Sequence, residues 1–433
     1  MSNIVAIVGR PNVGKSTLYN RLVERRDAII DDISGVTRDR KYGVCEWNGK
    51  KFTVVDTGGF VQHSEDVFEA AIRQQVSIAI EEATIIVFVT DTTTGITDLD
   101  EEVANMLRRT DKTVFLAVNK VDNGSRMLEA NEFYSLGFDN VFFIAALTGS
   151  GTGDLLDSIT EKVEDYAPEE LDIPKIAIIG QPNVGKSSLT NVLLGEDRNI
   201  VTNIAGTTRD SINSHYKKYG YDFILVDTAG IRKKSKVHED LEFYSVMRAI
   251  NALEESSVVL LVMDATDGIE SQDMSLFHLA QRRNKGIVIV VNKWDLIEKD
   301  TNTARDYEAK IRERIRPFDD VPILFVSVLE KQRIMKVVET AMEVVENRKR
   351  KITTSVLNET MQEIIKAVPP PSHRAHQIKI KYVTQLPTYH PSFAFFCNYP
   401  KHVKDSYRNF LENKLRENFK FTGSPISIFF REK

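Results

Sequence analysis

The sequence predicts an α/β protein: two tandem phosphate-binding domains, each with a doubly wound and mostly parallel sheet, followed by a small α+β domain. Three observations predict this fold class. The pattern GxxxxGK(S/T) occurs at 9–16 and again at 180–187, an offset of 171 residues. Short apolar runs alternate with helical stretches after each copy, and the last part of the chain is basic. A repeat of this size is typical of a duplicated domain rather than of a solenoid unit.

Length and composition limit what the chain can be. A chain of 433 residues is expected to form several domains of about 100–200 residues each. Cys45 and Cys397 are the only cysteines, which argues against a disulfide framework and a cysteine-rich metal site. A core strand begins at Ile4, and no apolar run is long enough to span a membrane. We therefore expect a cytoplasmic protein without a signal peptide or a membrane span. We also expect a monomer, although no sequence feature determines the oligomeric state.

Each phosphate-binding pattern stands between a predicted strand and a predicted helix, which is the context that the motif requires. Its glycines allow backbone N–H groups to surround phosphate oxygens at a helix N-terminus. We expect Lys15 and Lys186 to reach the β- and γ-phosphates, and Ser16 and Ser187 to bind Mg²⁺. The predicted loop residues are Gly9, Arg10, Pro11, Asn12, Val13, Gly14, Lys15, Ser16 and Thr17, and Gly180, Gln181, Pro182, Asn183, Val184, Gly185, Lys186, Ser187 and Ser188.

The strands of the two copies are predicted from apolar runs bounded by polar residues. The copies also share a hairpin turn, Asn48-Gly49 in the first and Tyr219-Gly220 in the second. The first copy's predicted strands are 4–8, 52–55, 85–89, 114–118 and 141–144, and those of the second are 176–179, 223–226, 258–263, 287–291 and 323–326.

Two further motifs recur at matching distances and predict a nucleotide switch. Asp56 and Asp227 end strands in the pattern DxxG, where an aspartate can reach Mg²⁺ and a glycine N–H can sense a γ-phosphate. Thr37 and Thr208 stand in polar Gly-x-Thr-Arg-Asp loops, where a threonine can bind Mg²⁺ only while triphosphate is present. The predicted DxxG residues are Asp56, Thr57, Gly58, Gly59 and Phe60, and Asp227, Thr228, Ala229, Gly230 and Ile231.

The pattern NKxD follows a strand in each copy and predicts selection of guanine. The carboxylates of Asp122 and Asp295 can accept hydrogen bonds from N1–H and the 2-amino group of guanine. Adenine would leave such a carboxylate unpaired, at a cost of about 1–3 kcal/mol for each buried group. The predicted residues are Asn119, Lys120, Val121 and Asp122, and Asn292, Lys293, Trp294 and Asp295. Together the motifs indicate GTP and Mg²⁺ at both sites.

Charge and proline divide the rest of the chain. From Arg350 onward there are 14 Lys and Arg against 6 Asp and Glu, a net charge of +8, so the remainder carries −13. Such a basic tail suggests a polyanionic partner. The acidic stretch near Pro168–Pro174 is either a linker or a helix end with a surface loop. We predict domains at 1–167 and 175–349, a linker at 168–174 and a tail domain at 350–433 with the order helix, strand, strand, helix, strand.

With these motifs in place, the whole chain resembles the double-Era-like (EngA/Der) GTPase family, whose tandem arrangement is its most specific feature. The resemblance implies tandem P-loop GTPase domains and a KH-like tail. It also implies hydrolysis of GTP in assembly of the large ribosomal subunit, and contact with its ribosomal RNA. It further implies base loops completed by Ala145, Ala146 and Leu147, and by Ser327, Val328 and Leu329, with Val328 where the family usually has alanine.

The resemblance also implies how hydrolysis proceeds without the water-orienting glutamine of Ras-like enzymes, since Phe60 and Ile231 hold that place. Similar GTPases use K⁺ held partly by a phosphate-loop asparagine, here Asn12 and Asn183. The alternative is that these asparagines only brace the loop. The predicted catalytic residues are Lys15, Lys186, Thr37, Thr208, Asn12 and Asn183, and the predicted Mg²⁺ ligands are Ser16, Thr37, Asp56, Ser187, Thr208 and Asp227.

The tail departs from the KH pattern because it lacks a GXXG loop, which places ordinary KH recognition in doubt. Its aromatic residues are interpreted as core: Phe393, Phe395, Phe396, Phe410 and Phe419. Its basic residues could bind phosphates or could be solvated surface charges: Lys379, Lys381, Lys401, Lys404, Arg408, Lys414 and Arg416.

The sequence therefore predicts a GTP-hydrolysing switch with two nucleotide sites and an RNA-facing tail. One alternative is a nucleotide-gated binding scaffold in which one site holds GTP without turnover. A membrane-remodelling GTPase is a weaker alternative, because no amphipathic membrane segment is evident.

Overall fold

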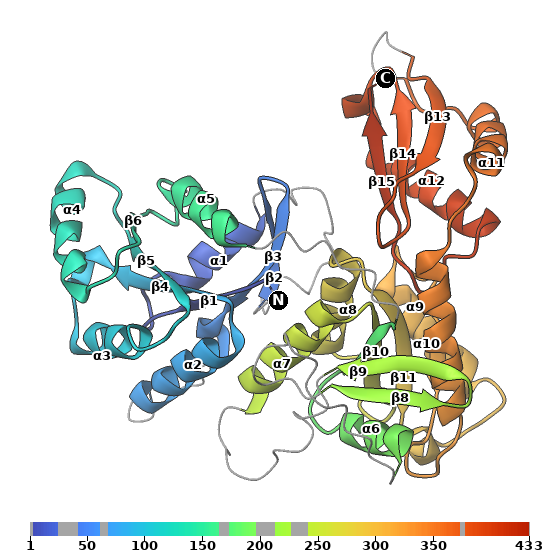
Figure 1. The fold of residues 1–433 in the computed structure, drawn as a ribbon, viewed down its shortest axis with the longest axis horizontal. Helices are drawn as coiled ribbons and strands as arrows, with labels where there is room; N and C mark the ends of the chain where they lie inside the picture. The colour runs from blue at the N-terminus through green and yellow to red at the C-terminus, as the bar shows by residue number, and fades with distance from the viewer. Residues whose placement is uncertain are drawn as a thin grey trace. The chain divides into compact units, whose positions relative to one another are not determined.

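The computed structural model describes residues 3–24, 42–60, 68–163, 173–195, 213–226, 241–372 and 377–432 (Figure 1). Part of the predicted linker and several predicted site residues lie outside this description. These residues are Thr37, Thr208, Asp227, Thr228, Ala229, Gly230 and Ile231.

The first sheet has six strands in the order β2-β3-β1-β4-β5-β6, and all neighbours are parallel except β2 and β3. Asn48 and Gly49 adopt positive φ angles of 48° and 80° between the antiparallel pair, as the predicted two-residue turn requires. The central strands are buried along their whole length because helices cover both faces. The bounds are β1 Ile4–Val8, β2 Tyr42–Trp47, β3 Lys50–Asp56, β4 Ile85–Asp91, β5 Thr113–Asn119 and β6 Val141–Phe143.

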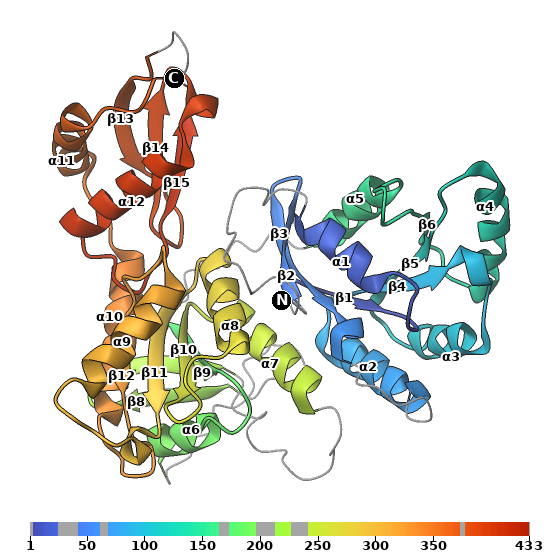
Figure 2. The ribbon, with the colours of Figure 1, turned by 180° about the vertical axis from the view of Figure 1, so that it is seen from behind.

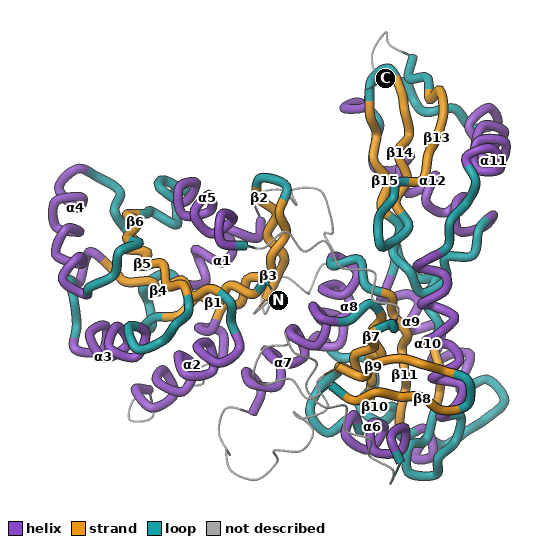
Figure 3. The backbone as a smooth tube through the Cα atoms, viewed as in Figure 1, coloured by secondary structure: helices purple, strands orange, loops and turns teal. Residues whose placement is uncertain are grey.

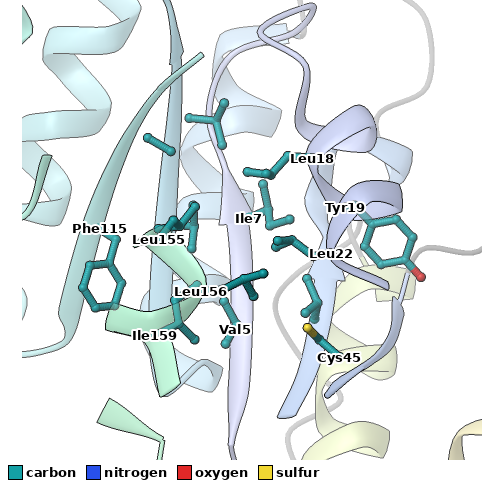
Figure 4. Packing of buried hydrophobic residues seen from close by; sticks show 14 of the residues in the cluster. Val5, Ile7, Leu18, Tyr19, Leu22, Cys45, Phe115, Leu155, Leu156 and Ile159 are labelled. Carbon is teal, nitrogen blue, oxygen red and sulfur yellow. The ribbon is translucent and has the colours of Figure 1, made fainter. Parts of the chain in front are cut away.

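Helices α1 and α5 cover one face of this sheet, and α2 and α3 cover the other (Figure 3). Figure 4 shows Leu18 and Leu22 of α1 beside Ile7 of β1, with Leu155 and Ile159 of α5 in the same core. The α-helices are α1 Lys15–Glu24, α2 Phe68–Glu82, α3 Asp98–Leu107, α4 Gly124–Glu129 and α5 Thr152–Lys162, and the 3₁₀ helices are η1 Thr57–Phe60, η3 Thr92–Thr94 and η4 Ala130–Leu136.

The second sheet repeats the first in the order β12-β11-β10-β7-β9-β8, again with one antiparallel pair, β8 and β9. Tyr219 and Gly220 form the turn of that pair with φ angles of 54° and 81°. The strands are β7 Lys175–Ile179, β8 Ser214–Lys218, β9 Tyr221–Val226, β10 Val258–Asp264, β11 Gly286–Asn292 and β12 Ile323–Phe325. The helices are α6 Lys186–Leu194, α7 Leu241–Glu255, α8 Ser271–Arg282, η5 Trp294–Leu296, α9 Thr303–Ile315 and α10 Ile334–Lys349.

The tail forms a three-stranded sheet in the order β13-β14-β15, with β13 antiparallel and β15 parallel to β14. The predicted order of elements is confirmed. The elements are α11 Thr354–Ala367, β13 Ile380–Gln385, β14 Ser392–Cys397, η6 Pro400–His402, α12 Asp405–Asn418 and β15 Ser427–Arg431. Phe393 and Phe395 are core residues as predicted, and Phe410 and Phe419 pack against that core. Phe396 is the exception, because its place in the ladder directs it to the opposite face of the sheet.

Contacts divide the chain into two compact units that do not follow the repeat. One unit holds residues 1–167 together with 233–255, and the other holds 168–232 together with 256–433. Helix α7 therefore packs with the first copy, although it follows the second copy's DxxG motif in sequence. The tail domain packs with the second copy. No helix of the described residues is long and apolar enough to cross a membrane.

Candidate functional site

The first phosphate loop has a backbone that only glycine can adopt at its two ends. Gly9 has a φ of +144°, and a Cβ added there would lie 2.3 Å from the carbonyl oxygen of Val89. Gly14 has a φ of +94°, and its Cβ would lie 2.3 Å from Nδ2 of Asn119. These close approaches place the loop directly at the carboxyl ends of β4 and β5.

The second loop repeats this geometry. A Cβ at Gly180 would lie 2.2 Å from the Val262 carbonyl oxygen, and one at Gly185 would lie 2.2 Å from Nδ2 of Asn292. Asn12 and Asn183 both have a φ of 64°, a left-handed conformation that asparagine tolerates better than most residues. The two copies therefore share one loop conformation.

Each loop lysine turns back over its own loop. Nζ of Lys15 donates to the carbonyl oxygens of Gly9 at 2.8 Å and Arg10 at 2.7 Å. Nζ of Lys186 donates to Gly180 at 2.9 Å and also to Gln181. Burial lowers the pKa of Lys15 to about 8, although the negative charge of Asp56 opposes this shift. An anion in the loop would favour the charged form of this lysine.

The predicted Mg²⁺ ligands of the first copy that are described lie together. Oγ of Ser16 donates to Oδ2 of Asp56 at 2.6 Å, and the N–H of Gly58 donates to Oδ1 of the same aspartate at 2.9 Å. A hydroxyl oxygen beside a carboxylate is a donor set that fits Mg²⁺. Of the second copy's predicted ligands, only Ser187 is within the described residues.

The asparagine of each NKxD motif joins the phosphate loop to the base loop. Nδ2 of Asn119 donates to the Val13 carbonyl at 2.8 Å, and its Oδ1 accepts from the N–H of Ala146 at 2.9 Å. Asn292 makes the same two bonds, to Val184 at 2.9 Å and from Val328 at 3.1 Å. Val328 thus keeps the backbone contact of Ala146 despite its different side chain.

The lysine of each NKxD motif is fixed by an aspartate that the motifs did not include. Lys120 pairs with Asp91, and Lys293 pairs with Asp264. Burial would raise the pKa of both carboxyls, but hydrogen bonds from the lysines and from Thr93 or Thr266 hold each pKa below its ordinary value. The pattern Asp-x-Thr ends the third parallel strand in both copies, and this repetition could have revealed the two aspartates.

The predicted guanine-binding carboxylates differ in their surroundings. In the first site Asp122 accepts from Nη1 of Arg126 at 2.7 Å and from Nδ2 of Asn123 at 3.1 Å, so both oxygens are partnered. In the second site Oδ1 of Asp295 is buried and has no hydrogen-bond partner among the described residues. A buried carboxylate oxygen without a donor fits a ligand that brings one, as guanine does.

The second residue of each phosphate loop contacts a buried aspartate, and the contact differs between the two copies. Nε of Arg10 lies 3.1 Å from Oδ2 of the buried Asp100. Gln181 replaces this arginine and donates to Asp273. Burial raises the pKa of Asp273 to about 6, although the hydrogen bonds from Gln181 and the Glu270 backbone oppose the shift.

The fold brings the described motif residues together at the carboxyl ends of the parallel strands, where ligands bind in open α/β sheets. In the first copy these are the phosphate loop, Asp56 with η1, Asn119–Asp122 and the base loop 145–147. In the second they are the phosphate loop, Asn292–Asp295 and the base loop 327–329. Each site can hold a phosphate chain at one end and a purine at the other.

Comparison with known proteins agrees with this geometry. A family model described as a 50S ribosome-binding GTPase matches residues 4–120 and 175–293. A second, described as the KH-domain-like C-terminal domain of EngA bacterial GTPase enzymes, matches residues 351–431.

Individual proteins match along the whole chain. A GTPase Der of Christiangramia forsetii is 59% identical over 434 residues, with 100% of both chains covered. A GTPase Der of Flavobacterium johnsoniae is 57% identical over 436 residues, again with 100% of both chains covered. Among solved structures, one of Era from Aquifex aeolicus bound to GDP·AlF4⁻ has 21% identity and a TM-score of 0.32, covering 60% of this chain and 93% of that chain.

Proposed function

Because the chain belongs to the Der (EngA) family of tandem GTPases, we propose that it acts as a GTP-dependent switch in assembly of the large ribosomal subunit. It binds and hydrolyses GTP, as its relatives and both P-loop domains indicate. The observation that carries the proposal is the match of both copies to a ribosome-binding GTPase family, combined with a basic tail on an acidic body. The proposal places the protein in the cytoplasm as a monomer, with the domain limits predicted from the sequence.

The proposed roles at each site follow the contacts described above. Lys15 and Lys186 bind the β- and γ-phosphates, and the glycine N–H groups of the loops surround them. Ser16, Thr37 and Asp56 would hold Mg²⁺ in the first site, and Ser187, Thr208 and Asp227 in the second. Mg²⁺ would neutralise charge on the β- and γ-phosphates. Asp122 and Asp295 accept hydrogen bonds from guanine, and the base loops complete the purine pocket.

Neither site has the glutamine that orients water in Ras-like enzymes. We propose that K⁺, bound beside Asn12 and Asn183, supports hydrolysis in its place. The left-handed φ of both asparagines offers a competing reason for their presence, namely that the loop needs a residue that tolerates this backbone. Replacing Asn12 with glycine separates the two ideas, because glycine accepts the backbone and removes the side-chain oxygen. With the second site disabled by Lys186→Ala, the variant should bind GTP but lose its faster turnover in K⁺ than in Na⁺. Unchanged stimulation by K⁺ would show that the asparagine is structural.

The test of the proposed function is co-sedimentation with ribosomal subunits. Full-length protein should pellet with large subunits in the presence of a non-hydrolysable GTP analogue and less so with GDP. We expect this dependence because loops that order around a γ-phosphate differ between the two states. Equal binding in both states, or no preference for the large subunit, contradicts the proposal.

The scaffold alternative makes a different prediction for turnover. Replacing Lys15 or Lys186 singly with alanine should leave measurable hydrolysis from the other site if both sites are enzymes. If one of the two variants has no activity beyond the double variant, the remaining site binds GTP without turnover.

A further inference from the structure

The sheet of the tail domain has one covered face and one open face. Register and burial assign Val383, Phe393, Phe395 and Ile428 to the covered face, where they form the core with α11 and α12. Helix α12 passes behind the strands in Figure 1 and in front of them in Figure 2, which is the view from behind. No helix lies over the other face of the sheet in the described part of the tail. We call that face the open face; its residues are Tyr382, Thr384, Ala394, Phe396, Phe429 and Arg431.

The open face carries aromatic rings where a solvated sheet would carry polar groups. Tyr382 and Phe396 pair across β13 and β14 with their rings stacked, 4.4 Å apart and inclined by 12°. Phe429 lies on β15, opposite Ala394 and one step along the strand from the pair, and is 45% exposed. Ala394 lies between Thr384 and Phe429 in the ladder and is fully buried. The rings of Tyr382 and Phe396 face each other, so the pair presents ring edges and its outer faces as an apolar surface beside Arg431, which is opposite Phe396.

The segment 377–404, which contains β13 and β14, is basic, although Glu432 follows Arg431 at the end of β15. Residues 377–404 contain four lysines and two histidines but no aspartate or glutamate. A β-bulge between Ile380 and Tyr382 puts Lys381 outside the ladder, where it is exposed. Lys379 and Lys401 are exposed at the same end of the sheet as the stacked pair. A polyanion is therefore the ligand whose charge complements this surface.

Three of the other basic residues that could bind phosphates form ion pairs. Arg408 pairs with Asp405 at 3.1 Å and Lys414 with Glu417 on the exposed side of α12. Arg416 is mostly buried, pairs with Glu412 and Asp320, and lies 4.6 Å from the Phe318 ring centroid. Within the described residues, no ion pair engages Lys379, Lys381, Lys401 or Lys404. Among these seven candidate residues, those without an ion pair in the described structure therefore precede α12 in the chain, and Lys379, Lys381 and Lys401 flank the strands of the open face.

We propose that the open face binds unstacked bases of single-stranded RNA, with Tyr382, Phe396 and Phe429 as the stacking surface and Lys379, Lys381 and Arg431 at the backbone. Flat aromatic rings flanked by cations are the combination that single-stranded nucleic acids require, because every base has a stacking face and every linkage a charge. This surface lies on the sheet, so it does not depend on the GXXG loop that the tail lacks. The inference deepens the RNA-facing role given to the tail under the proposed function and rests on it.

The experiment uses full-length protein and a fluorescent oligouridine of about 12 nucleotides, with an RNA duplex of equal length for comparison. Phe429→Ser removes the most exposed ring, and stacking of one base predicts a loss of affinity of at least about 5-fold without a change in salt dependence. Lys381→Ala should instead reduce the slope of log affinity against log salt by about 0.7. Phe429→Tyr keeps a ring and should bind as wild type, and Lys414→Ala on α12 is the matched charge control.

Three results would overturn the inference: equal affinity of Phe429→Ser and wild type, binding of duplex as tight as of single strand, or an equal loss in Lys414→Ala. No binding of RNA by the wild type overturns it too and leaves a protein as the occupant of the open face. Photocrosslinking of 5-iodouridine RNA should map to peptides containing Tyr382, Phe396 or Phe429.

Subunit co-sedimentation separates this inference from the proposed function. If wild type fails to pellet with large subunits but Phe429→Ser still weakens oligouridine binding, the ribosomal role is wrong and RNA binding by the open face is supported. If wild type pellets with them and Phe429→Ser has no effect on either assay, the ribosomal role stands and the open face is wrong.

Discussion

At the scale of single residues, the two nucleotide sites have the same backbone conformation, but their aspartates have different hydrogen-bond and ion-pair partners. Asp122 has Arg126 and Asn123 as donors, whereas Oδ1 of Asp295 has none among the described residues. Asp100 has an arginine, whereas Asp273 has Gln181. These differences lie at positions that the motifs leave variable or do not include.

We expect the second site to bind GDP more tightly than the first. Guanine would supply a donor to the unpartnered oxygen of Asp295, whereas at Asp122 it must compete with Arg126. One buried hydrogen bond of this kind corresponds to about 1 kcal/mol, or about 5-fold in affinity. Titration with a fluorescent GDP analogue in Lys15→Ala and Lys186→Ala proteins isolates each site. Adding Arg126→Ala to the Lys186→Ala protein should reduce the difference in GDP affinity between the two sites. A weaker first site after that change would mean that Arg126 positions Asp122 rather than competing for it.

Asp273 should make the stability of the second unit depend on pH. Its folded pKa of about 6 exceeds the ordinary 3.8, so the folded state binds more protons between these values and stability falls as pH rises through that window. Asp273→Asn removes this penalty and should stabilise the protein at pH 7–8 by about 2–3 kcal/mol. The gain should vanish near pH 4.

Denaturant midpoints across pH provide the measurement. Asp100→Asn is the matched control, and it should destabilise the protein because it leaves the Arg10 guanidinium without its buried carboxylate. A stability gain for Asp273→Asn that is the same at pH 4 and pH 8 would contradict the titration argument.

At the scale of elements, the most informative contact joins α7 to α2. Glu82 near the end of α2 accepts from Nδ2 of Asn251 and lies 3.4 Å from Nε of Arg248, both on α7. Glu254 of α7 is buried and accepts from Oγ1 of Thr53 at 2.7 Å, on the strand that leads to Asp56. Helix α2 follows the first DxxG motif and α7 follows the second. A helix that follows one DxxG motif in sequence therefore contacts a helix that follows the other.

This contact predicts coupling between the sites. GDP release from the second site should change when the first site holds a GTP analogue instead of GDP, and Glu82→Ala should reduce that change. Glu102→Ala is the control, since it removes a glutamate of α3 that pairs with Arg73 of α2 and has no ion pair with α7 among the described residues. Stopped-flow release of a fluorescent GDP analogue measures the effect. Equal coupling in Glu82→Ala and wild type would falsify the role of this contact.

Most elements could be predicted from the sequence, because their signals are local. The apolar runs of β4 and β10 and the glycine turns of both hairpins depend on neighbouring residues alone, and they appear where expected. The phosphate-loop glycines could also be assigned, since their φ angles permit little else. The partner of α7 could not be predicted, because Glu82 and Asn251 are 169 residues apart and nothing in either helix marks the other. Phe396 was misassigned because an aromatic run does not show which face each ring takes.

At the scale of the whole molecule, the tail and the second copy share backbone hydrogen bonds. The N–H of Ile287 donates to the carbonyl of Gly423 at 2.7 Å, and the N–H of Gly423 donates to that of Asp320 at 2.8 Å. Nδ2 of Asn347 donates to the Thr422 carbonyl at 3.0 Å. These bonds join the second copy to the tail, so the two parts should unfold together.

Gly423→Ala tests this docking. Gly423 has a φ of +76°, and a Cβ there would lie 2.5 Å from Val344 Cγ2 and 3.0 Å from the Ile287 carbonyl oxygen. We expect a loss of at least about 2 kcal/mol and a thermal transition that splits in two as the tail separates. Gly220→Ala is the matched control, with a φ of +81° and no atom within 4 Å, and should cost about 1 kcal/mol without splitting the transition. Calorimetry distinguishes the two results; a single transition in Gly423→Ala would show that the tail unfolds with the second copy regardless of this contact.

The placement of α7 also bears on how such a chain can be recombined. The sequence repeat of 171 residues suggests a gene that doubled and could exchange its halves freely at the acidic stretch near Pro168. The packing does not divide at that point. In a chimera joined there, α7 from one parent would pack against α2 and Thr53 from the other. Hybrids of relatives that differ at Glu82 or Asn251 should therefore fold poorly, unless residues 233–255 come from the same parent as the first half of the chain. The segment that was duplicated in the sequence is therefore not the segment that could be exchanged between relatives without disturbing the packing.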